Sequence, residues 1–130
     1  MTYTLSFQEE DGYLKVTVEG SRAHVDPAKS GQRVVDQILN RCRESHYSRV
    51  MLVSHLTGSY PPFANYQVVT SLEQFGVPKE WKLAYVNLDE PSQKSVLFSE
   101  TLARNKGYQA CVFQREQDAH HWLIGDSPGD

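Results

Sequence analysis

Five histidines are the residues of this 130-residue sequence best suited to chemistry, because imidazole binds metal ions and moves protons near neutral pH. They are His24, His46, His55, His120 and His121. No pair has the i, i+4 spacing by which one helix presents two zinc ligands. His120 and His121 are adjacent, and on a helix their side chains diverge by about 100°. The spacing therefore favours no metal site, and we expect no metal or other cofactor.

Hydroxyl and thiol side chains are the candidate nucleophiles. The Gly-x-Ser-x-Gly elbow motif is absent around Ser54 and Ser59. Cys42 falls on the apolar stripe of a predicted helix, which suits an inert thiol. Cys111 lies far from Cys42 in another apolar segment, so we expect two buried free thiols in a reducing cytosol. This pattern predicts that the protein is not an enzyme.

His24 and His55 are of interest because each follows a predicted strand. Ligands of open parallel sheets bind beyond the carboxyl ends of the strands, so the two side chains are candidates for one site. The simpler interpretation, which we favour, is two loop histidines that have no role. An esterase-like enzyme is a third hypothesis, and it would need a serine within hydrogen-bond reach of either histidine.

Composition excludes several classes of function. The sequence has 13 Lys and Arg against 16 Asp and Glu, a net charge of −3, which does not suit binding to nucleic-acid phosphates or to anionic lipid. No apolar run approaches the roughly 20 residues that span a bilayer. The start, residues 1–5, lacks the basic and apolar regions of a signal peptide. We therefore expect a cytoplasmic protein.

Hydrophobic periodicity and turn residues divide the chain into strands and helices. Leu14, Val16 and Val18 alternate with polar neighbours, which is typical of a half-solvated strand, and the apolar run Val50–Val53 is typical of a strand covered on both faces. The predicted elements are strands at 4–8 and 13–19, a helix from Asp26-Pro27, a strand at 49–55, a helix from Pro61-Pro62 to about Phe75, a strand at 81–88, a helix from Asp89 to Gly107, a strand at 109–114 and a helix at 116–124.

The order ββαβαβαβα predicts an α/β fold. Three strand–helix–strand crossovers in series imply a mostly parallel sheet of five strands with four helices, and the first strand forms an antiparallel edge. We expect one domain over residues 1–124 and a disordered tail over residues 125–130.

The element order and the C-terminal run from Phe98 to Gly107, followed by Val112-Phe113 and then Ala119 and Trp122-Leu123, resemble the SpoIIAA-like (STAS-like) family. The resemblance implies a β/α superhelix shared with sulfate-transporter and anti-sigma-factor-antagonist domains, and related to lipid-carrying CRAL-TRIO domains. It implies a non-enzymatic domain that binds a small non-polar ligand or a protein partner. One form of this expectation places the binding at a membrane surface. A homodimer fits the same expectation.

A second function follows from the same resemblance: a phospho-regulated signalling partner like the anti-sigma-factor antagonists. Thr57 and Ser59 are the candidate phosphorylation sites, because they precede the second predicted helix, whose first turn favours an anion. The Asp-Ser-x-Gly-type motif of phosphorylated antagonists is absent from residues 54–62. A ligand binder should have an enclosed apolar pocket, whereas a phospho-regulated partner should have a solid core and an exposed hydroxyl.

The second predicted helix carries aromatic side chains away from its sheet-facing stripe. Phe63 and Tyr66 fall opposite the apolar face, and Tyr60 stands just before them. Contiguous exposed apolar residues tend to mark interaction sites. We therefore predict that Tyr60, Phe63 and Tyr66 form a lid over a ligand or a contact patch, and that His24 and His55 lie at the same ligand site.

Overall fold

The structure is a computed structural model that describes residues 3–21 and 26–125. Its elements, in chain order, are β1 (Tyr3–Glu10), β2 (Tyr13–Ser21), α1 (Pro27–Ser45), β3 (Arg49–Thr57), α2 (Pro62–Gln74), β4 (Lys82–Asn87), the 3-10 helix η1 (Glu90–Ser92), α3 (Gln93–Asn105), β5 (Gln109–Phe113) and α4 (Glu116–Ile124). The predicted element order is confirmed. Apart from Gly125, the predicted tail lies outside the described residues.

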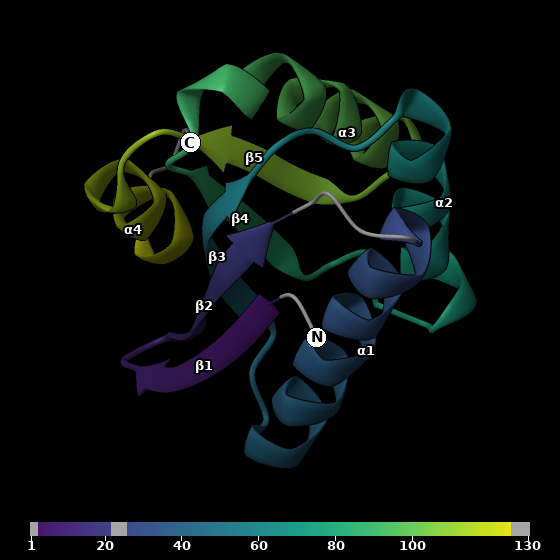
Figure 1. Cartoon of the computed structure of the whole chain (residues 1–130). Coiled ribbons are helices and arrows are strands. Elements are labelled where there is room, and N and C mark those ends of the chain that lie inside the picture. Colours follow the sequence, from purple (N-terminus) through teal and green to yellow (C-terminus); the bar gives the residue numbers. More distant parts are fainter. Residues whose placement is uncertain (1–2, 22–25, 126–130) are drawn as a thin grey trace.

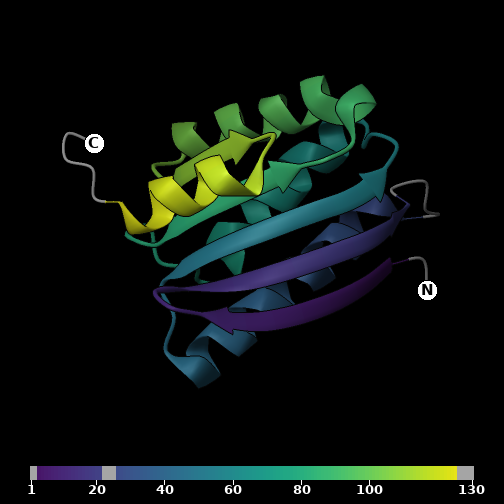
Figure 2. The same cartoon turned by 90° about the vertical axis from the view of Figure 1, so that its left-hand side faces the viewer.

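The five strands form one sheet in the order β1-β2-β3-β4-β5 (Figure 1). β1 and β2 are antiparallel, and every later neighbour pair is parallel. Because the parallel strands follow one another without reversal, crossovers of one hand place α1, α2 and α3 on the same face. The chain leaves β5 for the other face, where α4 lies (Figure 2). The five-stranded, mostly parallel sheet with an antiparallel N-terminal edge is thus as predicted.

Local signals explain where several elements begin and end. Asp26 caps α1 by accepting a hydrogen bond from the Lys29 backbone N–H at 3.1 Å. Gly107, with φ of 94°, lies just beyond the end of α3 in a left-handed conformation that glycine adopts without strain. The helix predicted to begin at Asp89 opens instead with the 3-10 turn η1, and α3 begins at Gln93. β3 runs two residues beyond the predicted strand, to Thr57.

The face covered by α4 is fully buried at its centre. Ala119 and Leu123 of α4 are fully buried against the strand residues Met51, Val53 and Val86. Trp122 is half-buried and packs against this cluster, with its ring centroid 5.8 Å from that of Phe113. A nine-residue helix has room for two inward positions here, so Trp122 lies at the border of the cluster.

α4 packs mainly on β3, β4 and β5 and also contacts the start of β2 through Tyr13, while the rest of this face of β1 and β2 has no helix over it in the described part of the chain (Figure 2). This face of β2 carries Lys15, Thr17 and Glu19, as the alternation predicts, and Lys15 pairs with Glu116 of α4 at 2.7 Å. No helix of the described residues is both long enough and apolar enough to cross a bilayer.

Candidate functional site

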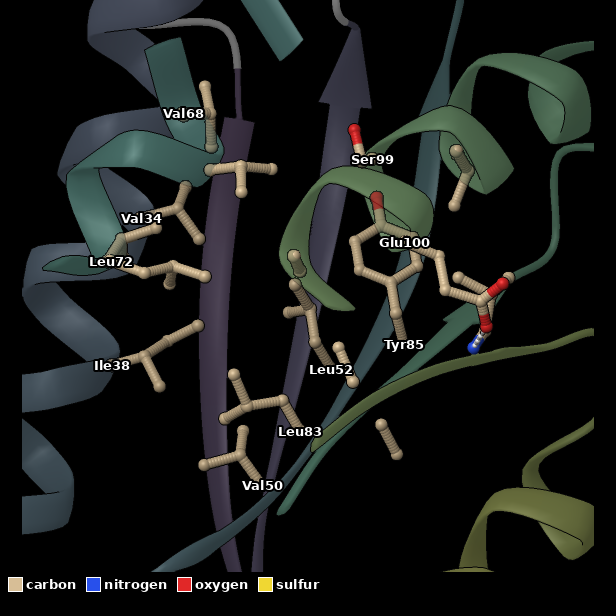
Figure 3. A pocket seen from close by; sticks show the side chains of 18 of the residues that line it. Val34, Ile38, Val50, Leu52, Val68, Leu72, Leu83, Tyr85, Ser99 and Glu100 are labelled. Atoms are coloured by element: carbon tan, nitrogen blue, oxygen red, sulfur yellow. Dashed lines mark hydrogen bonds between the residues drawn. The ribbon is translucent and has the colours of Figure 1, made fainter. Parts of the chain in front are cut away.

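A pocket of about 230 Å³ lies between the sheet and the three helices α1, α2 and α3 (Figure 3). Leu52 of β3 and Leu83 of β4 form part of its floor, while Val34 of α1 and Val68 and Leu72 of α2 stand across from them. Almost all of the lining side chains are apolar. The pocket therefore suits a small apolar molecule, and the core on this side of the sheet is hollow.

In the strands beneath the pocket, the side chains that face it are less buried than their neighbours on the opposite face. Side chains alternate between the two faces of a strand, so Met51 and Leu52 point in opposite directions. Met51, under α4, is 1% exposed, whereas Leu52, under the three helices, is only half-buried. In β4, Val86 is fully buried and Tyr85 is half-buried. Central strands with helices on both sides would have both sets buried if the packing were solid.

The three helices are held to one another above this void. Gly31 of α1 faces α2 so closely that an added Cβ would lie 2.6 Å from Val68 Cγ2 and 3.4 Å from the Tyr60 hydroxyl. Asn65 of α2 donates a hydrogen bond from Nδ2 to Ser95 Oγ of α3 at 3.0 Å. These contacts join α1 to α2 and α2 to α3, so the helix layer spans the pocket without collapsing onto the sheet.

The polar part of the pocket lies on the α3 side. Figure 3 shows Ser99 and Glu100 there, beside Tyr85 and away from the side chains of α1 and α2. Glu100 Oε2 accepts the backbone N–H of Val112 at 2.7 Å and lies 3.9 Å from an Arg104 guanidinium nitrogen. The pocket therefore has an apolar end and an end that carries a carboxylate held by the edge strand β5.

The two thiols differ in their surroundings, and both are free. Cys42 is buried as predicted, and burial raises its pKa to about 11. Cys111, predicted to be buried, is only half-buried because β5 is an edge strand, and it lines the pocket. Burial raises the pKa of Cys111, and the negative charge of Glu100 adds to that increase. Both thiols are therefore mostly protonated at neutral pH.

The structure separates the three aromatic residues of the predicted lid. Tyr60 is half-buried and lines the pocket. Phe63 and Tyr66 stack on the outer side of α2, with ring centroids 6.5 Å apart, and are 69% and 48% exposed. The ammonium of Lys106 lies 5.7 Å from the centroid of the Tyr66 ring. Tyr60 is therefore a wall residue of the pocket, while Phe63 and Tyr66 form a separate exposed pair.

The predicted histidines and hydroxyls do not gather at the pocket. His55 is exposed and points to the opposite face of β3, in register with Glu19, whereas Leu52 and Leu56 point into the pocket. His24 lies outside the described residues. Thr57 and Ser59 are both exposed, but Thr57 is the last residue of β3 rather than part of the α2 turn.

His120 and His121 lie on α4, across the sheet from the pocket. His120 Nδ1 lies 2.9 Å from the Tyr13 hydroxyl, so its ring is tied to the sheet, and His121 is exposed. The described residues contain no group of three or more His, Cys, Asp or Glu side chains that could hold a metal ion.

The pocket residues that sequence reasoning missed come from several elements. Leu52, Leu83 and Tyr85 read as ordinary core positions, and Glu100 reads as a solvated helix residue. Gly31 gave one usable signal, because a glycine inside a helical pattern usually has a packing reason. Here that reason is the close approach of α1 to α2 over the pocket.

No family model matches the sequence, and no curated protein matches it. Among solved structures, the chain is similar to an anti-sigma factor antagonist from Mycobacterium paratuberculosis, with a TM-score of 0.65 and 12% sequence identity. The match covers 95% of this chain and 96% of that one. A likeness at this identity concerns the fold. The chain therefore has the SpoIIAA-like fold of an anti-sigma factor antagonist, as its sequence predicted.

Proposed function

We propose that this protein is a non-enzymatic binding domain that holds a small apolar or amphipathic molecule between its sheet and α1–α3. The observation that carries the proposal is the pocket of about 230 Å³ with its nearly continuous apolar lining. Apolar cavities of about 150 Å³ bind benzene, so this pocket has room for a ligand of about nine heavy atoms. Concave, mostly apolar pockets with a few polar groups are the usual form of small-molecule sites.

The proposal includes no covalent chemistry. The thiol at the pocket, Cys111, has a raised pKa and is a poor nucleophile in its protonated form. Ser95, also in the lining, is engaged in the hydrogen bond from Asn65. We place the domain in the cytoplasm, where the free thiols Cys42 and Cys111 would stay reduced.

Native mass spectrometry of the protein purified from its own host tests the proposal. We expect a retained small molecule that Leu52→Phe displaces, because the larger ring would enter the pocket. Leu97→Phe is the matched control, since Leu97 is 41% exposed on α3 and does not line the pocket. A protein that never carries a ligand, or a ligand that both variants retain equally, would contradict the proposal.

The exposed pair Phe63–Tyr66 is the proposed contact surface for a protein partner, a second copy or a membrane surface, with Tyr60 as the contact to the ligand itself. Two stacked aromatic rings on one face expose apolar surface to water, and exposed apolar patches mark interaction sites. The segment has a positive neighbour in Lys106 but no Lys or Arg of its own, so membrane contact through it alone would be weak.

A Phe63→Ser, Tyr66→Ser double variant tests this surface. It should stay folded and lose ligand retention, self-association or liposome binding. The control is Leu97→Ser, Phe98→Ser, which removes two apolar side chains from α3 that are each 41% exposed. A double variant that behaves as the parent does in all three assays would contradict the proposal that this pair is a contact surface.

The alternative is a phospho-regulated signalling partner, favoured by the exposure of Thr57 and Ser59 and by the likeness to an anti-sigma factor antagonist. Pro61 and Pro62 weaken it, because two prolines at the start of α2 remove backbone N–H groups that would hold a phosphate. A phosphate adduct on Ser59 or Thr57 in the same mass spectra, with no small molecule, would favour this alternative over ligand binding.

A further inference from the structure

We infer that the ligand of the pocket carries a hydrogen-bond donor, a hydroxyl or an ammonium group, at its polar end, and not a carboxylate or phosphate. This inference rests on the proposed ligand-binding function and specifies the chemistry of that site. It follows from the side chains at the α3 side of the pocket, of which Glu100 is the only ionised one among the described lining residues.

Glu100 is a fixed acceptor. Its carboxylate accepts the Val112 N–H at 2.7 Å, and Arg104 lies 3.9 Å from the same oxygen. The Glu100 side chain is 19% exposed, so it cannot turn freely into water. A carboxylate has about four acceptor sites, so these two contacts and the nearby Cys111 thiol leave capacity for a donor from a ligand.

The sign of the local charge follows from these contacts. No Lys, Arg or His lines the pocket within residues 3–21 and 26–125. Arg104 offsets part of the charge of Glu100 but is itself largely exposed, and water screens it. A ligand carboxylate beside Glu100 would put two like charges in a partly dry site, which raises the cost of keeping both ionised. A hydroxyl or ammonium would instead donate to Glu100.

The other polar groups of the lining are compatible with a ligand that donates a hydrogen bond to Glu100. Side chains that can both donate and accept discriminate little between ligand types, and they are Ser99, Ser95, Asn65, Tyr60 and Tyr85. The indole of Trp81 can only donate, but it packs against the apolar clusters of the core rather than beside Glu100. Glu100 can only accept, and it therefore decides the preference.

Three eight-carbon probes test the inference: 1-octanol, octylamine and octanoate, each titrated at pH 7.5 while the methyl NMR signals of Leu52, Leu72 and Leu83 are followed. Leu123, on α4 across the sheet from the pocket, is the internal control for non-specific effects. We expect octanol and octylamine to shift the pocket methyl signals, and octanoate to bind about tenfold or more weakly than either.

Glu100→Gln separates the effect of Glu100 from the general free-energy cost of desolvating the octanoate carboxylate. The glutamine oxygen can still accept the Val112 N–H, so the fold should be kept. We expect octanoate to gain and octylamine to lose affinity, severalfold each, and Glu73→Gln, at an exposed carboxylate outside the lining, to change neither.

The outcomes distinguish this inference from the function on which it rests. Octanoate binding as tightly as octanol, or an unchanged ratio of octylamine to octanoate in Glu100→Gln, would overturn the donor assignment while leaving the pocket as a binding site. If no probe shifts any pocket methyl signal, ligand binding itself is contradicted, and this inference falls with it.

Discussion

The two faces of one sheet are packed in opposite ways. Under α4, Met51 and Val53 of β3 are buried against Ala119 and Leu123. Under α1, α2 and α3, Leu52 of the same strand faces a pocket and stays half-buried. The single short helix α4, which turns Ala119 and Leu123 inward, lies directly on its strands. Three longer helices that brace one another leave a space, so the helix layer decides whether a face is solid or hollow.

The largest effect should come from truncating neighbours on the two faces. Met51→Ala should lower the free energy of unfolding by about 2–5 kcal/mol, because it empties a filled site. Leu52→Ala should cost about 1–2 kcal/mol, because Leu52 already borders a void and loses fewer contacts. Urea denaturation measures both. Equal losses would mean that the two faces are equally well packed.

Trp122→Ala should have an intermediate effect. A fully buried tryptophan costs about 3–5 kcal/mol when truncated, but Trp122 is half-buried, so we expect about 1–3 kcal/mol. The loss should come mainly from its contact with Phe113 and from the Lys82 ammonium, 5.2 Å from its ring centroid. A melting temperature equal to that of the parent would place Trp122 outside the solid face.

The pocket occupies only part of the sheet face under α1, α2 and α3. The burial of Cys42 tests whether the rest of that face excludes water. Cys42 packs on Leu14, Val16 and Val50, and it does not line the pocket although Val50 does. Burial raises its pKa from about 9 to about 11. The unfolded thiol therefore loses its proton first as pH rises, and stability should fall between about pH 9 and 11.

At pH 10.5 the loss attributable to Cys42 should be about 2 kcal/mol relative to pH 7.5. The control is Cys42→Ala, which should lack this part of the alkaline loss while keeping whatever tyrosines and lysines contribute. Denaturation curves at the two pH values measure the difference. An identical pH dependence in both proteins would show that water reaches Cys42.

The smallest effect should come from enlarging Leu52, and enlarging its neighbour Met51 is the matched comparison. Leu52→Phe fills part of the pocket and should raise stability by about 0.5–1 kcal/mol. Met51→Phe overpacks the solid face and should lower it by about 1–3 kcal/mol. Denaturation midpoints with unchanged slopes measure both. A destabilising Leu52→Phe would mean that no usable space lies above Leu52.

Much of the fold was predictable because its signals are local. The alternation of Leu14, Val16 and Val18 and the run Val50–Val53 identify an edge hairpin and a covered strand, and the helix start at Asp26 follows from its capping chemistry. The pocket was anticipated only as a property of the class. Its existence depends on the distance between the helix layer and the sheet, which no local pattern encodes.

Site residues were harder to predict for the same reason. Helical spacing correctly separated Phe63 and Tyr66 from the sheet-facing side of α2, but it could not show that Tyr60 turns inward. His55 was a candidate because we expected it to follow a strand, but it lies within β3, where strand alternation places its side chain on the face opposite the pocket. Glu100 was missed because its role comes from the neighbouring edge strand rather than from its own helix.

A crystal structure determined under xenon pressure tests the central claim most directly, because xenon enters dry apolar cavities whatever the natural ligand is. The hollow face predicts xenon between Leu52, Leu72 and Leu83, and none between α4 and the sheet. Side chains that close over this volume and leave no xenon there, or xenon bound instead beneath α4, would contradict the account.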